Sequence, residues 1–429
     1  GGAVKHPDKG KVFDMNGPMG KEAGIEDANV MLYPTDGYGD IEFIRTLIKR
    51  ENPDAIFMIT DPRYYEWLFQ NEMEFRRKMP IIYLNIWDDV PAPVYNKEFY
   101  ESCDALLGIS KQTVNINKMV LGSKAKGKII EYVPHGLNNN IFKPLDESNK
   151  EFKIFKDKLF DGKKYDFVLL FNSRNIRRKS IPDALLAWKV FTDQLPPEKA
   201  KKTAFILKTE PIEGHGTDLP AVIEYFFTDS NTNVFVLGER LPSIEMSYLY
   251  NCADGTILLS SNEGWGLALT ESLLTATPFI ANVTGGMQDQ MRFIDSKGNW
   301  FTPDSDIPSN HRGTYKEHGK WAYPVYPASI SLQGSPKTPY IYDDRCSWEE
   351  AAEQIKNLYH TTPNERKERG LAGREWALGD EAGFTSEKMT KRMIKYIDKL
   401  FDTWQPIPKY QFVKDTDFEK RVLPHKLLY

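Results

Sequence analysis

Short apolar runs alternate with segments of helical periodicity along most of this 429-residue chain. In the first third of the chain, these runs occupy residues 54–60, 80–86, 104–110 and 129–134. Runs that are apolar at successive positions predict strands buried on both faces, as in a parallel sheet. Residues 40–53 instead carry apolar side chains at helical spacing, which predicts an amphipathic helix that ends near Pro53.

A second series of apolar runs follows a polar stretch around residues 143–147. Its runs occupy residues 166–173, 203–210, 233–239, 255–261 and 277–283, with helical segments at 181–191 and 244–251. Two such series predict an α/β protein with two doubly wound, Rossmann-like domains that face each other across a cleft. We expect an N-terminal domain over residues 1–146, a second domain over 147–385, and a C-terminal helix and tail over 386–429.

Residues 295–345 form a long excursion in the second series and show no clear period. Prolines and glycines are frequent there, together with aromatic residues such as Trp300, Trp321 and Tyr340. Loops of this length in compact domains are usually functional or disordered. The sequence leaves two interpretations equally open, an ordered lid or acceptor platform and a surface excursion without a role.

The composition is that of a globular protein, with 41% hydrophobic and 27% charged residues. A net charge of -4 and a pI near 6.1 give no general attraction to nucleic acid or to a membrane surface. The three cysteines are scattered without the spacing of metal ligands, which favours a reducing compartment and a site without metal. We therefore expect a cytoplasmic protein, with peripheral membrane contact left open and the oligomeric state undetermined.

Candidate chemistry is concentrated after the run at 255–261. Glu263 follows this predicted strand, Gly264 and Gly266 come next, and Glu271 lies about two turns into the following helical segment. Ligands of such sheets bind at the carboxyl ends of strands and at helix N-termini. Glycines let backbone N–H groups approach an anion closely. A carboxylate can accept from two vicinal hydroxyls, as on a ribose.

A basic stretch follows the run at 166–173 in the same way. Arg174 comes directly after this predicted strand, and Lys179 stands at the start of the next helix. Two cations at this position suit a diphosphate that gains charge as a bond breaks. Arg177 and Arg178 compete for the same role, and a solvated basic face is the alternative for the whole stretch.

These elements together resemble the family 4 retaining glycosyltransferases of the GT-B fold. The matching motifs are an Arg-x4-Lys pair at Arg174 and Lys179, a Glu-x7-Glu element at Glu263 and Glu271 with Gly-Trp-Gly after the first glutamate, and the pair Gly285 and Gly286. Residues 132–144 are similar to the family's hinge entry, and Ser180 stands where the family usually has glycine. On this resemblance Arg174 and Lys179 rank above the other two arginines, and the helix at 386–404 crosses back to the N-terminal domain.

The resemblance implies roles for the matching residues. Arg174 and Lys179 would bind the diphosphate of a UDP- or GDP-sugar donor, Glu263 the transferred sugar, and Glu271 the ribose. The donor-binding set would also include Gly264, Trp265, Gly266 and Leu267, with Trp265 supporting the loop. The implied reaction transfers a sugar to a hydroxyl of a saccharide, lipid or small molecule, with retention of anomeric configuration and with no metal or cofactor required.

The N-terminal half departs from the family pattern. Its first residues have neither the strand nor the helix with which the family opens, and we expect that portion to be missing from this sequence. Trp87, Asp88 and Asp89 follow the run at 80–86, where family members often have a histidine. Asp88 is therefore a candidate for sugar or acceptor contact, and it joins Glu263, Arg174 and Lys179 as a candidate catalytic residue. At least one of the two aspartates is nevertheless expected to cap a helix or turn. His135 is a candidate for the hinge or for an acceptor contact.

Two other function classes stay open at this point. The same enzyme could glycosylate a hydroxymethylated base in DNA, a partner that local basic stretches permit and the net charge disfavours. The chain could also be a non-catalytic module that binds nucleotide sugars or another protein.

Overall fold

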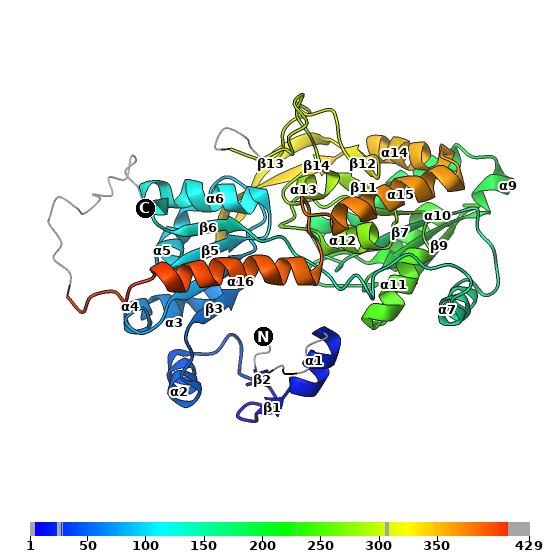
Figure 1. The fold of residues 1–429 in the computed structure, drawn as a ribbon. Helices are drawn as coiled ribbons and strands as arrows, with labels where there is room; N and C mark the ends of the chain where they lie inside the picture. Colours follow the sequence, from blue (N-terminus) through cyan, green and yellow to red (C-terminus); the bar gives the residue numbers. More distant parts are fainter. Residues whose placement is uncertain (1–4, 24–26, 28, 229, 305–308, 411–429) are drawn as a thin grey trace.

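The computed structural model describes residues 5–23, 27, 29–228, 230–304 and 309–410. Two parallel sheets lie side by side, each with helices on both faces (Figure 1). The first sheet contains, in spatial order, β3 (Ile56–Ile59), β4 (Ile81–Asn85), β5 (Ala105–Gly108) and β6 (Ile129–Tyr132). These strands coincide with the four apolar runs predicted in the first third of the chain.

Burial on both faces explains why the two central strands, β4 and β5, read as continuous apolar runs. Successive side chains of a strand point to opposite faces of the sheet. In β4, Ile81 and Tyr83 pack into one core of the N-terminal domain, whereas Ile82 and Leu84 belong to the larger core that continues into the other domain. The helices of this domain include α2 (Ile41–Glu51), α5 (Lys97–Glu101) and α6 (Lys111–Leu121).

The second sheet has six parallel strands in the order β12-β11-β10-β7-β8-β9. Its strands are β7 (Phe167–Asn172), β8 (Thr203–Lys208), β9 (Asn233–Leu237), β10 (Gly255–Leu258), β11 (Phe279–Asn282) and β12 (Ala322–Val325). From β7 the chain continues through β8 to β9 on one side of the sheet, and from β10 it continues through β11 to β12 on the other side. The order therefore reverses between β7 and β10, which is where doubly wound sheets bind ligands.

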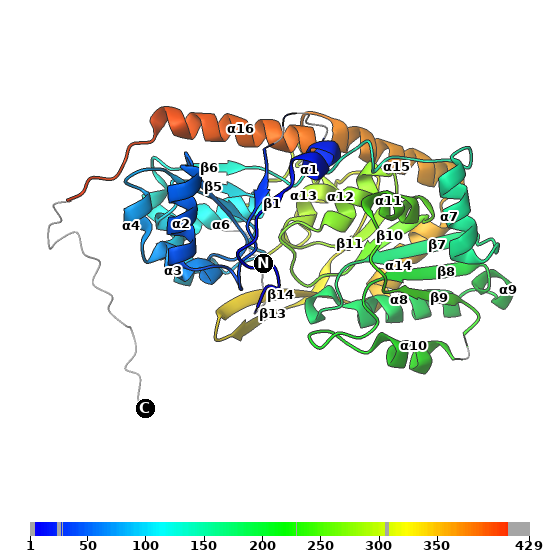
Figure 2. The same cartoon turned by 90° about the horizontal axis from the view of Figure 1, so that it is seen from below.

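Helices cover both faces of this second sheet (Figure 2). One face carries α8 (Ile181–Asp193), α10 (Leu219–Phe227) and α14 (Trp348–His360), and the other carries α11 (Ser243–Asn251), α12 (Leu267–Leu274) and α15 (Pro363–Leu378). The remaining elements are β1 (Phe13–Asp14), α1 (Asn16–Ala23), β2 (Met31–Leu32), η1 (Pro62–Tyr65), α3 (Glu66–Phe69), α4 (Glu72–Phe75), η2 (Val94–Asn96), η3 (Gly122–Ala125), α7 (Lys150–Phe160), η4 (Arg177–Lys179), α9 (Pro197–Ala200) and α13 (Met287–Met291).

The opening residues do contain a helix, α1, but a short one. Its sequence, with two glycines and a single methionine, has no apolar stripe that a pattern could reveal. Strands β1 and β2 pair with each other and not with the four-stranded sheet.

The excursion at 295–345 contributes regular structure that the sequence does not predict. Strand β12 joins the edge of the six-stranded sheet, and β13 (Pro327–Ser335) and β14 (Thr338–Cys346) form an antiparallel hairpin. β12 has only four residues and includes Pro324, which is tolerated because the strand lies at an edge. The hairpin extends toward the N-terminal domain (Figure 2).

Helix α16 (Ser386–Thr403) leaves the second domain and runs along the first (Figure 1). It packs near β6, where the ammonium of Lys399 lies 3.5 Å from the carboxylate of Glu131. The limits of the domains at residues 146 and 385 stay predictions. Among the described residues, no helix combines the length and the apolar character that crossing a bilayer requires.

We expect Gly370→Ala to destabilise the packing of α15 on α12. An added Cβ at position 370 would lie 1.8 Å from the carbonyl oxygen of Ala276, which is backbone and cannot rotate away. Overpacking of this kind typically costs about 1–3 kcal/mol, so the melting temperature should fall by several degrees in calorimetry. Gly214→Ala is the control, because a Cβ at position 214 meets nothing within 4 Å. Equal melting temperatures for the two variants would contradict the prediction.

Candidate active site

A cavity of about 420 Å³ opens where the loops after β7 and β10 diverge. Ten of the residues that the sequence singles out line this one cavity: Asp88, His135, Arg174, Lys179, Glu263, Gly264, Trp265, Gly266, Leu267 and Glu271. The first two come from the N-terminal domain and the rest from the second domain. The cavity therefore lies between the two domains at the reversal of strand order.

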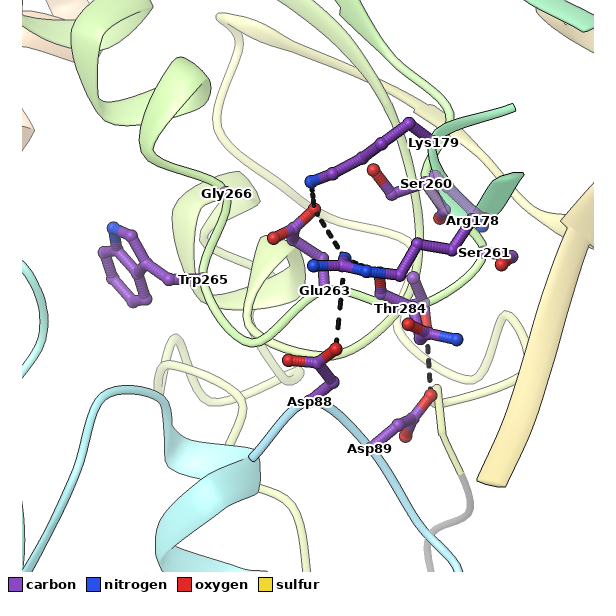
Figure 3. Close-up of polar contacts among 12 residues, drawn as sticks. Asp88, Asp89, Arg178, Lys179, Ser260, Ser261, Glu263, Trp265, Gly266 and Thr284 are labelled. Carbon is purple, nitrogen blue, oxygen red and sulfur yellow. Dashed lines mark hydrogen bonds and ion pairs between the residues drawn. The ribbon is translucent and has the colours of Figure 1, made fainter. Parts of the chain in front are cut away.

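A buried ion pair forms the centre of this cavity. Lys179, at the end of η4, donates to Oε2 of Glu263, and both side chains are buried (Figure 3). Burial alone would raise the pKa of Glu263, but Lys179 and Arg178 hold that pKa below its usual value. Glu263 is therefore ionised and holds the ammonium of Lys179 at the cavity wall.

Arg178 lies closer to this centre than Arg174 does. Nη1 of Arg178 lies 3.2 Å from Oε2 of Glu263 and donates to the carbonyl of Asn262 at 2.7 Å. Arg174 lines the cavity from its rim, with 63% of its side chain exposed and an ion pair to Glu213 at 2.8 Å. The ranking that placed Arg178 below Arg174 rested on the family motif, and spacing alone could not show which arginine turns inward. Arg177 lines a different cavity.

Ser180 has a left-handed backbone conformation with φ of 50°. This region favours glycine, since other residues are strained in it. Ser180 also precedes α8 as its N-cap residue. The left-handed conformation is one in which glycine would be unstrained, and this chain adopts it with serine.

Glu271 lies on α12 and is held by two partners that the sequence did not indicate. The hydroxyl of Tyr250 donates to Oε2 of Glu271 at 2.6 Å, and Nδ2 of Asn172 donates to the same oxygen at 3.0 Å. Burial raises the pKa of Glu271 to about 7, and these two hydrogen bonds only partly oppose that shift. Asn172 is the last residue of β7, a position that could have suggested a site residue.

The loop after β10 touches the N-terminal domain. An added Cβ at Gly264 would lie 2.7 Å from the carbonyl oxygen of Ile86, so only glycine allows this approach. The backbone N–H of Gly264 donates to Asp88, whose pKa is raised by burial and partly restored by Arg178. The carboxylate of Asp88 lies 3.9 Å from Nη1 of Arg178 (Figure 3). Asp88, Arg178 and Glu263 thus form a charged contact between the domains.

Asp89 points away from this cavity. It is fully buried, its Oδ1 accepts from the N–H of Val90 at 2.8 Å, and Thr284 donates to its Oδ2 at 3.3 Å (Figure 3). Burial raises the pKa of Asp89 well above its usual value, and the neighbouring Asp344 adds to the shift. Asp89 is the structural member of the pair, while Asp88 faces the cavity.

The N-terminus of α12 also faces the cavity. Gly266 is the N-cap residue, with φ of 83° and no side-chain cap, and Leu267 and Ala268 follow it in the cavity wall. The first N–H groups of a helix have no intrahelical partners and attract anions. This end of α12 can therefore bind an anionic group between Glu263 and Glu271.

Trp265 and His135 form an aromatic contact beside the cavity. Trp265 is buried, donates from Nε1 to Thr270 at 2.8 Å and packs edge-on against Phe384. The ring of His135 lies 6.5 Å from that of Trp265, and burial lowers the pKa of His135. A neutral imidazole here can contact a ligand without adding charge. Among the described residues, no group of three or more His, Cys, Asp or Glu side chains is arranged to hold a metal ion.

No model of a known protein family matches the chain, and no curated protein matches its sequence. Solved structures do match. A glycosyltransferase from Rickettsia africae is 13% identical, with a TM-score of 0.61 over 91% of this chain and 89% of that one. HepE of Anabaena, solved with UDP and glucose, is 14% identical with a TM-score of 0.59 over 84% of each chain. Sucrose-phosphate synthase from Thermosynechococcus elongatus is 16% identical, with a TM-score of 0.57 over 84% and 77%.

These similarities show the fold. The chain has the GT-B architecture predicted from its sequence, with two Rossmann-like domains that face each other across a cleft.

Proposed function

We propose that the protein is a retaining glycosyltransferase that moves a sugar from a nucleoside-diphosphate donor to a hydroxyl group of a saccharide, lipid or small molecule. The observation that carries this proposal is the single cavity that combines Lys179, Arg178, an open helix N-terminus and two separate carboxylates. HepE, a structural neighbour, was solved with UDP and with UDP-glucose, which favours a UDP-sugar over a GDP-sugar as the donor.

The cavity suggests how a donor would lie in it. Its diphosphate would contact Lys179, Arg178 and the N-terminus of α12, with Arg174 able to reach it from the rim. Glu271 would accept from the ribose hydroxyls, and Glu263 would accept from hydroxyls of the transferred sugar. Two carboxylates on opposite sides of the phosphate-binding groups can discriminate both ends of the donor.

In the proposed reaction, the bond between the anomeric carbon and the diphosphate oxygen breaks, and its electron pair stays on the diphosphate. The acceptor oxygen forms the new bond on the same face of the sugar, and its proton passes to the leaving diphosphate. Lys179, Arg178 and the N–H groups of Leu267 and Ala268 would stabilise the charge that develops on the leaving group. This chemistry requires no resident metal or cofactor.

A cytoplasmic location belongs to the same proposal. Cys103, Cys252 and Cys346 are all free thiols, which suits a reducing compartment.

Nucleotide release from UDP-, GDP- and ADP-sugars tests the proposal directly. We expect UDP-sugars to be consumed, and we expect a saturating UDP-sugar at about 100 times its Kd to stabilise the fold by about 2.7 kcal/mol. Glu263→Gln should strongly lower turnover, because the neutral amide cannot replace the negative charge that pairs with Lys179 and accepts from the sugar. Glu239→Gln is the control, since Glu239 is exposed and lies outside the cavity. The anomeric configuration of the product, followed by NMR, checks retention.

If no nucleotide sugar is turned over and none raises the melting temperature, the proposal is wrong. Inversion at the anomeric carbon would refute only the stereochemical part.

A further inference from the structure

Another cavity, of about 170 Å³, adjoins the cavity of the candidate active site. Ile86 and Asp88 line both, so Asp88 stands between them. The other walls come from the N-terminal domain and from the β13–β14 hairpin, which supplies Thr338 and Ile341. We refer to this space as the hairpin pocket.

The hairpin is fixed against the N-terminal domain by several hydrogen bonds. The N–H of Tyr342 donates to the carbonyl of Val90 at 2.9 Å, and the hydroxyl of Tyr340 donates to the carbonyl of Ala92 at 3.3 Å. Nη1 of Arg63 donates to Oγ1 of Thr338 at 3.0 Å. The β13–β14 hairpin is therefore a fixed wall of the hairpin pocket.

The hairpin pocket contains a polar group that lacks a partner. Tyr83 on β4 lines the pocket and is only 1% exposed, and its hydroxyl is buried without a hydrogen-bond partner among the described residues. A buried hydroxyl left unpaired costs about 1–3 kcal/mol. This hydroxyl is therefore available to a ligand or a water in the pocket.

The chemistry of the walls defines the class of ligand. Trp87, Ile86 and Ile341 supply apolar surface, while Tyr83, Thr338 and Asp88 supply hydroxyl and carboxylate groups. Arg63 is paired with Asp61 through two of its nitrogens, so these charges offset each other and offer little to a charged ligand. The mixture of apolar faces and hydroxyl-binding groups suits a neutral sugar ring. A liquid water takes about 30 Å³, so the hairpin pocket, at about 170 Å³, has room for only a few waters. A space of this size suits one sugar ring and not an extended chain.

We propose that the hairpin pocket binds the acceptor as a neutral monosaccharide unit, free or at the end of a glycan. This inference rests on the proposed function, because Asp88 places the acceptor hydroxyl next to the sugar of a bound donor. Most walls of the pocket come from the N-terminal domain, but the hairpin of the second domain would help to select the acceptor.

The test uses D-glucose, D-galactose and D-mannose as probes with the full chain. We expect at least one of them to accelerate nucleotide release from a UDP-sugar and to show saturation-transfer NMR signals. Ile341→Trp fills the pocket from the hairpin side and should lower acceptor kcat/KM at least tenfold and remove the NMR signals. Tyr83→Phe should raise the acceptor KM several-fold while the Kd of UDP, measured by calorimetry, stays within twofold.

Leu332→Trp is the matched control, because Leu332 is an exposed residue of the same hairpin. It should behave as the wild-type protein does. Wild-type acceptor kinetics in Ile341→Trp would overturn the inference, as would UDP-sugar turnover without binding of any probe. If a probe binds in the pocket but no nucleotide sugar is bound or turned over, the pocket stands and the proposed function fails.

Discussion

Lys179→Met is expected to lower turnover of the nucleotide-sugar donor by about 10² to 10³-fold. The ammonium of Lys179 is the most buried cation in the cavity wall and would face the diphosphate as it gains charge. Loss of one such preorganised group typically costs about 3–4 kcal/mol of transition-state stabilisation. The drop should appear mainly in kcat, measured by UDP release at saturating donor, because the leaving-group charge is largest in the transition state.

Stability should fall less than activity in this variant. Breaking a buried ion pair commonly costs about 3–5 kcal/mol, but Arg178 remains 3.2 Å from Glu263 and compensates part of the loss. Lys189→Met is the control, since Lys189 pairs with Asp193 on the surface of α8. The catalytic role of Lys179 would be refuted by a variant that unfolds at a lower temperature yet keeps wild-type kcat below that temperature.

Glu271→Gln is expected to weaken donor binding by about 10 to 100-fold at pH 8. Hydrogen bonds to a charged group are worth about 1.5–3 kcal/mol, and the amide of the variant keeps the shape of the side chain without its charge. In the wild-type protein, donor affinity should rise between pH 6 and pH 8, because Glu271 ionises with a pKa of about 7. In Glu271→Gln this rise should be smaller, because only the terminal phosphate of UDP, whose second pKa is about 6, still ionises over this range. Calorimetric titration with UDP at each pH measures both effects.

The stability of the protein should respond to pH in the opposite sense. The pKa of Glu271 is raised on folding from 4.5 to about 7. The protonated form is therefore favoured by the fold, and its contribution is complete below about pH 4.5 and lost as the pH rises through 7. The loss amounts to about 3 kcal/mol.

Denaturant unfolding at pH 5 and pH 8 should show a larger decrease for the wild-type protein than for Glu271→Gln. Asp289, with a pKa raised to about 6 by burial, titrates in the same window in both proteins and cancels in the comparison. Identical pH profiles for the two proteins would mean that Glu271 does not titrate as the structure indicates.

The strands of both sheets other than β12 could be predicted because they are apolar at most successive positions, as strands in parallel sheets are. The predicted run at 203–210 corresponds to β8, and the run at 255–261 to β10, with differences of a few residues at the ends. The hairpin at 327–346 escaped prediction for the converse reason. Most residues of β13 are exposed or half-buried, so the strand has no apolar pattern to read.

The candidate site could be located from the sequence because its residues follow strands β7 and β10 directly. Spacing could not show how side chains turn in three dimensions. Asn172, Tyr250 and Arg178 contact the predicted glutamates, yet Tyr250 comes from α11, and only the packing of α11 against α12 brings it to Glu271. The hairpin pocket could not be predicted from the sequence either, because two of its lining residues, Asp61 and Ile341, are 280 positions apart.

The hydrogen bond from Tyr342 to Val90 limits how such proteins can diverge by recombination of their N-terminal and C-terminal halves. The face that the N-terminal half presents to the cleft is completed by twenty residues encoded far downstream, in the other half of the gene. A chimaera joined near residue 146 would therefore pair a foreign surface with the resident hairpin and lose its fit there. A recombinant that carries residues 327–346 along with the first half would keep both sides of that contact.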